Sequence, residues 1–418
     1  MHILLRKFSY IAISFMFYYI IFILVPAFFN SDLYYKIYKD LPYANPIGID
    51  LAIYLDFIRA WQEGNLFQFS YLNVYPPLCT LFLFPLVNLE HKTAYTILSA
   101  CTIASFFIIG IVIPYLKNKS SETLVLSAFL TLLTFISYPF RFQLERGQLD
   151  IIMMMFCFLS ILIFHQYGRK YVILSYVLFS FSIQIKLLSA IFVFTFFRQN
   201  DTVIKLLKRV LVLGAINIAL TLSLGLDKSS HFFSSLYERS TGDSFIHELN
   251  TSVSSFFSLT KRDFKERFED GNEKYAPIIA AIDPLKYVVY LMLIGGLFLG
   301  LYISFKNKLG GDFPPLLMIC SLIIILLPQT SHDYKLPVLV TPLLYILTEN
   351  FEAKTTKIKK ILQFSLVFLF MSTFWYHKQG YLVFKMNTPA LCLIYLICIL
   401  LLFHFNGMRF IKNSKTIP

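Results

Sequence analysis

The sequence predicts an all-α polytopic integral membrane protein, and three observations support this fold class. First, 57% of the 418 residues are hydrophobic and only 15% are charged. Second, apolar runs long enough to cross ~30 Å of hydrocarbon recur along the whole chain. Third, the positive charges gather in short loops between these runs and at the tail. We therefore expect a single membrane domain over residues 1–418.

Twelve apolar runs are the expected transmembrane helices. They cover residues 8–29, 73–89, 94–115, 122–138, 149–166, 171–197, 208–226, 286–304, 315–328, 336–348, 361–376 and 388–405. Several are short for a full crossing, which favours broken or re-entrant helices at those places. The first run is long and no small-x-small cleavage site follows it, so we interpret it as a retained signal anchor.

The distribution of charge predicts the orientation of the chain. The net charge is +13, and four segments are rich in Lys and Arg: the N-terminus, 198–209, 349–360 and 409–415. Such segments favour the cytoplasmic side, and this interpretation fits better than a nucleic-acid partner. Twelve crossings then place both termini in the cytoplasm and residues 30–72 and 227–285 in extracytoplasmic loops. The aromatic and apolar residues of the first loop recur at helical spacing, which predicts interfacial helices there.

Two interpretations remain open for the loop Arg146-Gly-Gln-Leu-Asp150. Simple counting of spans places it on the cytoplasmic side. If Gly168-Arg-Lys170 is cytoplasmic instead, the loop lies outside and the run 171–197 is split at Lys186. The loop combines arginine, which binds phosphate bidentately, with a glycine that lets a backbone approach a ligand. An ordinary charged turn between helices is the alternative.

A carboxylate lies in the first outer loop. The sequence Asp50-Leu-Ala-Ile-Tyr54 puts Asp50 and Tyr54 on one helix face. The functional interpretation makes Asp50 a general base or a metal ligand, and the structural alternative makes it a helix N-cap. Asp56 and Arg59 are expected to pair with each other. Tyr75-Pro-Pro77 is compatible with a helix start at the interface, and its spacing from Asp50 adds weight.

Lys186 lies well inside an apolar run, about ten residues from the nearest end. A lysine at such a position faces the bundle interior or a water-filled cavity and usually marks a functional site, with snorkelling as the alternative. A lipid-linked phosphate is its natural partner. Asn250-Thr-Ser252 fits either a helix cap or contacts with sugar hydroxyls. His332 falls in a predicted outer turn, where it either helps to bind an acceptor or belongs to an ordinary hairpin.

Several chemistries find no support in the sequence. His pairs with zinc spacing, a Walker loop, GxGxxG and GxSxG are all absent. No cofactor is therefore expected, and a divalent metal is permitted but not implied.

The order of these motifs resembles the polyprenyl-phosphate-sugar-dependent transferases of glycosyltransferase family 87, a mannosyltransferase-like group with the GT-C fold. The motifs that carry the resemblance are Asp50-Leu-Ala-Ile-Tyr54, Trp61-Gln-Glu-Gly64, Tyr75-Pro-Pro-Leu78, Pro85-Leu86, Arg146-Gly-Gln-Leu-Asp150, Ile185-Lys186, Asn250-Thr-Ser252 and Ser331 to Pro337. The resemblance spans residues 48 to about 340. Asp150 departs from the asparagine usual in the family.

The resemblance implies a role for each matching residue. Asp50 would be the catalytic base at the extracytoplasmic face. Arg146, Gln148 and Lys186 would bind the donor phosphate, and the two cations would stabilise the leaving group. The resemblance also implies inversion at the anomeric carbon, and it favours the topology with the Gly147 loop outside. Tyr54, Tyr75, Asn250 and His332 are the further candidates for substrate binding.

The resulting hypothesis is a membrane glycosyltransferase of GT-C architecture in the bacterial inner (plasma) membrane. It would move a hexose such as mannose from a polyprenyl-phosphate sugar to a lipid-linked or glycan acceptor, with membrane lipids and no nucleic acid as further partners. One rival is an O-antigen-type polysaccharide polymerase or ligase, which would rely on arginines and histidines of the loop 227–285. The other is a lipid or solute transporter, which would use Lys186 and Asp50 as ion or substrate sites.

Overall fold

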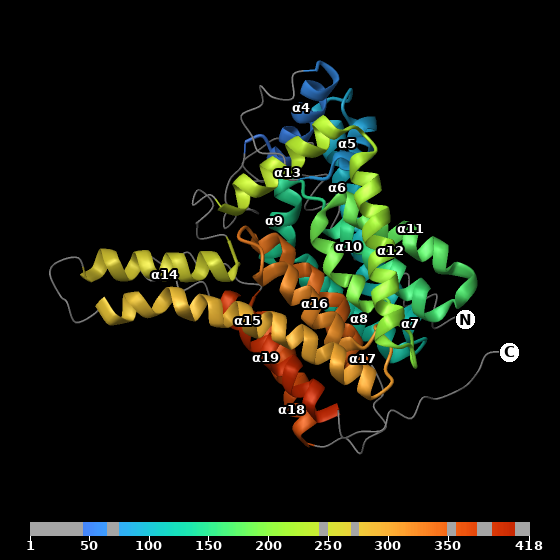
Figure 1. Ribbon diagram of the computed structural model, residues 1–418, viewed down its shortest axis with the longest axis vertical. Coiled ribbons are helices and arrows are strands. Elements are labelled where there is room, and N and C mark those ends of the chain that lie inside the picture. The colour runs from blue at the N-terminus through green and yellow to red at the C-terminus, as the bar shows by residue number, and fades with distance from the viewer. Residues whose placement is uncertain are drawn as a thin grey trace.

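Figure 1 shows the computed structural model of the chain, a bundle of helices with an arm on one side. The structure describes residues 45–64, 75–241, 250–268, 276–348, 357–373 and 387–405. Within these ranges the regular structure is helical, and the only β interaction is an isolated antiparallel bridge between Asn250 and His332. The prediction of an all-α fold is confirmed for this part of the chain.

The first half of the described chain contains short helices near Asp50 and the helices that form one side of the bundle. They are α4 (Ile49–Gln62), α5 (Pro77–Leu83), α6 (His91–Phe107), α7 (Ile113–Lys117), α8 (Ser121–Phe135), α9 (Tyr138–Arg146), α10 (Asp150–Gln166), α11 (Val172–Ile185), α12 (Val203–Leu222) and α13 (Leu226–Thr241). A π-helical turn, Ile108–Val112, joins α6 and α7 into one continuous helix.

The second half adds the arm and the remaining bundle helices. They are α14 (Val253–Phe268), α15 (Ala276–Lys306), α16 (Pro314–Leu326), α17 (Val340–Thr348), α18 (Lys357–Ser372) and α19 (Asn387–Phe405). In Figure 1, α14 and the first half of α15 run side by side away from the bundle. Every residue of α16 is buried, so this helix, apolar on all sides, lies at the centre.

Three helices are long and apolar enough to cross a membrane: His91–Lys117, Ala276–Lys306 and Asn387–His404. Two bent pairs raise the number to five if each pair counts as one span. The first pair, α8 with α9, is bent by 62°, and the second, α12 with α13, by 110°. Length and composition thus support a membrane protein with three to five spans in the described residues, which is fewer than the twelve predicted.

The difference from twelve arises because many predicted runs form short or broken helices. Helices occupy the predicted runs from 73–89 onward, but α5, α10, α11, α16 and α18 are shorter than a full crossing. The run 8–29 lies outside the described residues. Of the interfacial helices expected in 30–72, the described residues contain only α4.

The chain reverses direction at Lys186. The helix α11 ends at Ile185, Lys186 is extended with φ −157° and ψ 122°, and a 3₁₀ segment, Leu187–Thr195, follows. This segment returns to the other end of α10, where the carbonyl oxygen of Thr195 lies 3.0 Å from Nε2 of His165. The predicted alternative, a run split at Lys186, is therefore confirmed. The Gly147 loop consequently lies at the same end of the bundle as Asp50, opposite to Arg198.

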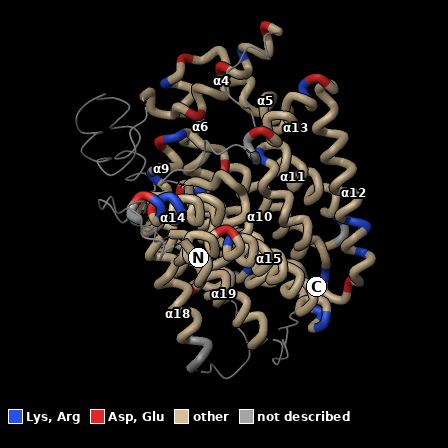
Figure 2. The backbone as a smooth tube through the Cα atoms, turned by 60° about the vertical axis from the view of Figure 1, so that its left-hand side comes forward, with Lys and Arg blue, Asp and Glu red and all other residues tan. Residues whose placement is uncertain are grey.

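The bundle separates apolar from charged surface. Large side chains such as Leu211 on α12 and Leu291 on α15 are more than two-thirds exposed, as expected for a surface that faces lipid. Charged residues gather near the helix ends and along α14, and long stretches between them carry none (Figure 2).

Candidate active site

Two glycines bring the start of α4 against the end of α9. Gly48 precedes α4 with φ 73°, and Gly147 follows α9 with φ 68°, a left-handed conformation that glycine adopts without strain. The backbone N–H of Gly48 donates to the carbonyl oxygen of Glu145 at 2.7 Å. A Cβ on Gly147 would lie 3.3 Å from the Cα of Gly48, so no larger residue fits this contact easily. The close approach sets the first turn of α4 beside the last turn of α9.

The close approach of α4 to α9 places Asp50 beside Arg146. The guanidinium donates two hydrogen bonds to the carboxylate, from Nε to Oδ2 at 3.0 Å and from Nη2 to Oδ1 at 2.6 Å. Asp50 is buried, and the side chain of Arg146 is about one-third exposed. The N-cap alternative for Asp50 is wrong, because Gly48 occupies that position and the carboxylate is bound to α9 instead.

Gln148 joins the two halves of the cluster. Its Nε2 donates to Oδ2 of Asp50. Its Oε1 faces three donors, namely Nζ of Lys186 at 3.3 Å, the hydroxyl of Tyr75 at 3.2 Å and the hydroxyl of Tyr54 at 3.4 Å. Asp50 and Lys186 fix the orientation of the amide, since a flipped amide would set its NH₂ group against the ammonium and its oxygen against the carboxylate.

Lys186 forms the second ion pair of the cluster. Its Nζ lies 2.7 Å from Oδ2 of Asp150, and both side chains are buried. The same Nζ lies 5.3 Å from the ring centroid of Tyr75 and 5.7 Å from that of Tyr334. The ammonium group is thus paired inside the protein and does not extend to its surface. The lysine occupies the break between α11 and the 3₁₀ segment, where a carboxylate and two aromatic faces surround it.

Tyr54 and Tyr75 close the cluster on the side of α4 and α5. Their hydroxyls contact each other, and their ring centroids are 4.4 Å apart in an edge-to-face arrangement. Burial raises the pKa of Tyr54 well above its ordinary value, and the charge of Asp50 raises it further. The phenol of Tyr54 therefore remains protonated at physiological pH and acts as a neutral donor.

Asn250 and His332 lie together but in a different structural setting. The buried amide of Asn250 accepts from the backbone N–H of Ser331 at 2.8 Å and donates to the carbonyl oxygen of Gln329 at 2.8 Å. Ser252 caps α14 by accepting from the N–H of Ser255. The helix-cap interpretation of this motif is therefore confirmed. The ring centroid of His332 lies 5.1 Å from that of Tyr334 in a tilted arrangement, and the Tyr334 ring in turn lies beside Lys186.

Two residues of the cluster were not among the predicted site residues. Asp150 was noted only as a departure from a family pattern, although it is the ion-pair partner of Lys186. Tyr334 was quoted with the late motif, but its position beside Lys186 and Phe142 gives it a place at the site. A buried lysine needs a nearby anion, so the acid closest to an Arg-Gly-Gln motif was the available signal for Asp150.

The arrangement provides two carboxylates, two cations and a set of neutral donors in one largely buried place. Two aspartates and two cations balance in charge, so an anionic ligand would find partners that it must share with existing ion pairs. Among the residues that the structure describes, no group of three or more His, Cys, Asp or Glu side chains is placed to hold a metal ion. The chemistry that these side chains offer is proton removal and phosphate binding.

The fold and the cluster together describe an all-helical membrane protein with a group of interacting charged side chains at one end of its bundle. The family model described as "Glycosyltransferase family 87" matches residues 73–327, and the chain belongs to this family. It is therefore a membrane glycosyltransferase of GT-C type. The matched range contains Tyr75, Arg146, Gln148 and Lys186, whereas Asp50 precedes it. No curated protein matches the chain.

Proposed function

We propose that the protein transfers a hexose, mannose or a similar sugar, from a polyprenyl-phosphate donor to a lipid-linked or glycan acceptor. Asp50 acts as the base, and the donor phosphate binds to Arg146, Gln148 and Lys186. The observation that carries this proposal is the contact of the buried Asp50 with Arg146. A second cation, Lys186, lies close by and donates to the side chain of Gln148. A base beside phosphate-binding cations is what direct displacement of a lipid phosphate requires.

The chemical step needs no protein nucleophile. The acceptor hydroxyl attacks the anomeric carbon while its proton passes to the carboxylate of Asp50. The bond between the anomeric carbon and the phosphate oxygen breaks, and the electron pair leaves with the polyprenyl phosphate. A single displacement of this kind inverts the anomeric configuration. Arg146 and Lys186 stabilise the leaving phosphate, and Gln148 keeps the two sides of the site in register.

Donor binding must first release Asp50. The carboxylate of Asp50 accepts two hydrogen bonds from Arg146 and one from Gln148, so its oxygens are occupied by other donors. The phosphate of the donor competes for the same guanidinium. When Arg146 turns toward the phosphate, the carboxylate of Asp50 becomes free to accept the proton of the acceptor hydroxyl. In this mechanism the donor activates the base, so the base is unpaired only when a substrate is present.

A large apolar groove supports a donor with a lipid tail. A cavity of about 780 Å³ lies between α5, α11 and α12. Its wall includes Leu78, Phe82, Val177, Ile185 and Leu220. The helices α5 and α11 that form it lead directly to Tyr75 and Lys186 of the cluster. Lipid surrounds the protein, so the groove gives shape and direction to an isoprenoid tail, and affinity comes from the phosphate contacts.

We place the site at the extracytoplasmic face and both termini in the cytoplasm of a bacterial inner membrane. The Lys- and Arg-rich segment 198–209 supports this orientation, since it lies at the end of the bundle opposite to Asp50. A polyprenyl-phosphate sugar suits this arrangement because its tail stays in the membrane while its head reaches the outer surface.

The proposal is tested with purified protein in lipid vesicles and a panel of radiolabelled polyprenyl-phosphate hexoses. A total membrane lipid and glycan extract supplies the acceptor. We expect label from one donor to appear in an extractable product with inverted anomeric configuration. Transfer from a sugar nucleotide without any lipid carrier, or retention of configuration, would contradict the proposal. Movement of intact donor across the vesicle without a new glycosidic bond would favour a transporter.

A further inference from the structure

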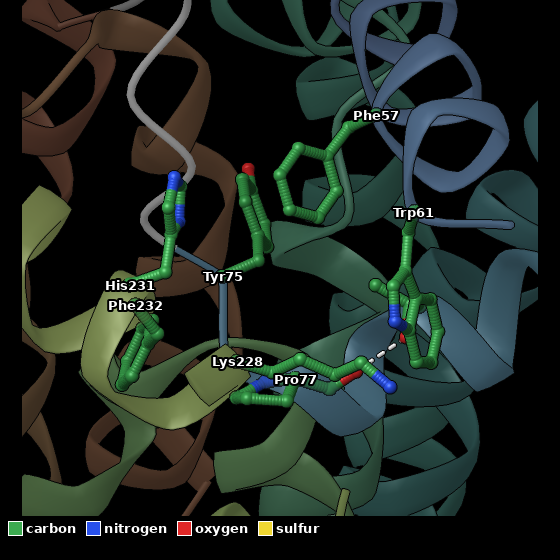
Figure 3. Close-up of a pocket in the computed structure, with 8 residues that line it drawn as sticks. Phe57, Trp61, Tyr75, Pro77, Lys228, His231 and Phe232 are labelled. Carbon is green, nitrogen blue, oxygen red and sulfur yellow. Dashed lines mark hydrogen bonds between the residues drawn. The ribbon is translucent and has the colours of Figure 1, made fainter. Parts of the chain in front are cut away.

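A second, aromatic cleft shares a wall with the acid–base cluster. Figure 3 shows it between α4, α5 and α13. Tyr75 belongs to both places: its hydroxyl contacts Tyr54 and Gln148 in the cluster, and its ring lines the cleft. The other lining residues come from three helices and are mostly aromatic: Phe57, Trp61, Pro77, Thr80, Lys228, His231 and Phe232.

The cleft is narrow in this conformation, and Lys228 covers one of its aromatic walls. The cavity measures about 20 Å³, which is enough for about one water molecule. The ammonium of Lys228 lies 4.2 Å from the ring centroid of Trp61, so it covers the face of the indole (Figure 3). Among the residues that the structure describes, no acid pairs with Lys228. A cation on a flexible four-carbon stem can leave an aromatic face at little cost.

The composition of the cleft fits a sugar ring. The C–H faces of a pyranose pack against aromatic rings, and its hydroxyls accept hydrogen bonds from an ammonium group. Trp61 and Phe57 on α4 offer the rings, and Lys228 on α13 offers the donor. A lipid tail without a headgroup would need neither an indole face nor a cation beside it.

The position of the cleft identifies which sugar it would hold. Trp61 follows Asp50 by eleven residues on one helix, which corresponds to about 16 Å along the axis of α4. The reacting hydroxyl must lie at Asp50, so a ring on Trp61 belongs to a more distant unit of the same acceptor. A monosaccharide acceptor cannot reach both places, whereas a chain of about three sugars can.

We propose that this cleft is an acceptor subsite for an inner sugar of an oligosaccharide chain. Lys228 moves off the indole, the sugar ring stacks on Trp61, and the ammonium group of Lys228 then donates to the hydroxyls of that sugar. The proposal rests on the proposed transferase function and deepens it, since it names the acceptor class as an extended glycan. No covalent step occurs in the cleft.

Intrinsic fluorescence tests the binding step without any transfer assay. The chain has two tryptophans, and Trp375→Phe leaves Trp61 as the only reporter. Mannotriose and maltotriose are titrated into this variant beside mannose and glucose. We expect a saturable change in emission with a trisaccharide at concentrations at least roughly five- to ten-fold below those of the monosaccharides. An emission that neither trisaccharide changes, or equal responses to trisaccharides and monosaccharides, would overturn the proposal.

Kinetics tests the same subsite in the reaction. Trp61→Ala should raise the acceptor concentration for half-maximal transfer roughly five- to ten-fold, and should leave the maximal rate and the donor requirement within two-fold. Trp61→Phe should retain most acceptor affinity because a ring remains. Phe233→Ala is the matched control, since this exposed aromatic residue of α13 does not line the cleft.

The two experiments separate the subsite from the function on which it rests. Wild-type protein without transfer from any donor would contradict the proposed function, and the fluorescence titration would still decide the cleft. Normal transfer with an unchanged acceptor requirement in Trp61→Ala would overturn the subsite and leave the proposed function intact. Quenching of Trp61 by vesicles of anionic lipid but by no trisaccharide would assign the cleft to a lipid headgroup and overturn the proposal as well.

Discussion

The two ends of the bundle both contain buried or partly buried charges, but the charges are held in different ways. At the opposite end from the site, Lys117 donates to the backbone oxygen of Asp312 at 2.8 Å and to its carboxylate at 3.2 Å. His165 contacts the same carboxylate at 3.4 Å and the carbonyl oxygen of Thr195 at 3.0 Å. These groups thus tie the loop before α16 to α7, α10 and the 3₁₀ segment through backbone oxygens.

The charges of the site cluster contact other side chains, without the backbone oxygens that take part at the opposite end. The hydrogen bonds that bind Asp50, Arg146, Asp150 and Lys186 run from side chain to side chain, with Gln148 between the two pairs. Such contacts can be exchanged for contacts with a ligand while the backbone stays in place. The comparison indicates that the contacts at the end with Lys117 stabilise the fold. At the end with Asp50, the side-chain contacts can rearrange when a ligand binds.

Replacement of an aspartate by asparagine at each end, at Asp50 and at Asp312, should give the sharpest contrast. Asp50→Asn removes the proton acceptor and keeps an oxygen for Arg146, so we expect transfer to fall by about 10³-fold or more while the protein still folds. Initial rates of label transfer at saturating substrates measure this effect. Asp56→Asn is the matched control, because this acid of the same helix is exposed and pairs with Arg59 rather than with a residue of the site cluster. Equal rates for Asp50→Asn and wild type would remove Asp50 from the mechanism.

The pair Lys186–Asp150 should couple strongly. Lys186→Met leaves the buried carboxylate of Asp150 without its cation and should destabilise the protein by about 3–5 kcal/mol. The double change with Asp150→Asn should recover much of that loss, since no uncompensated charge remains. Thermal unfolding of both single variants and the double variant in one detergent gives the coupling energy. Additive losses would show that the two groups do not depend on each other.

Asp312→Asn should lower stability but not activity, whereas Asp50→Asn should lower activity while the protein still folds. We expect it to destabilise the protein by about 1–3 kcal/mol and to leave transfer per folded molecule unchanged. Burial alone would raise the pKa of Asp312, but Lys117 and His165 outweigh burial and hold the pKa below its ordinary value. A lowered pKa means that the ionised acid stabilises the fold above about pH 4, and that this contribution is lost as the pH falls further.

The pH dependence provides the check on Asp312. Melting temperatures of wild type and Asp312→Asn should differ at pH 7 and converge as the pH is lowered below about 4. A constant difference across this range would show that the stabilisation by Asp312 does not depend on its charge.

The smallest effect is expected at the pair Asp56–Arg59, although its N–O distance of 2.6 Å is among the shortest in the described structure. Both side chains are about half exposed, and water screens such a pair. Asp56→Ala should change the free energy of unfolding by less than about 0.5 kcal/mol. A loss as large as that of Asp312→Asn would show that exposure does not separate the two kinds of pair.

Sequence reasoning found the individual residues of the site better than the path of the chain. Asp50, Arg146, Gln148 and Lys186 were selected separately, and the structure brings them within hydrogen-bonding distance of one another. Residue chemistry made this selection possible, because buried charges in an apolar chain are rare and costly. The roles assigned to these residues remain predictions.

The backbone features that assemble the site were harder to predict. Hydropathy reports how apolar a run is, but α11 and the 3₁₀ segment after Lys186 are equally apolar, so composition alone left the reversal as one of two alternatives. The contact between Gly48 and Gly147 joins segments about a hundred residues apart, and no local pattern encodes it. The partner of Lys186 was missed for a similar reason, since only the fold sets Asp150 beside it.

The central claim is that Asp50 removes the acceptor proton at a site that already holds the donor. The most direct measurement loads wild type and Asp50→Asn with the same radiolabelled polyprenyl-phosphate hexose, determines the bound fraction, and then follows a single turnover after acceptor is added. We expect both proteins to bind the donor with similar affinity and only the wild type to transfer label. Transfer by donor-loaded Asp50→Asn at a rate near that of the wild type would contradict the claim.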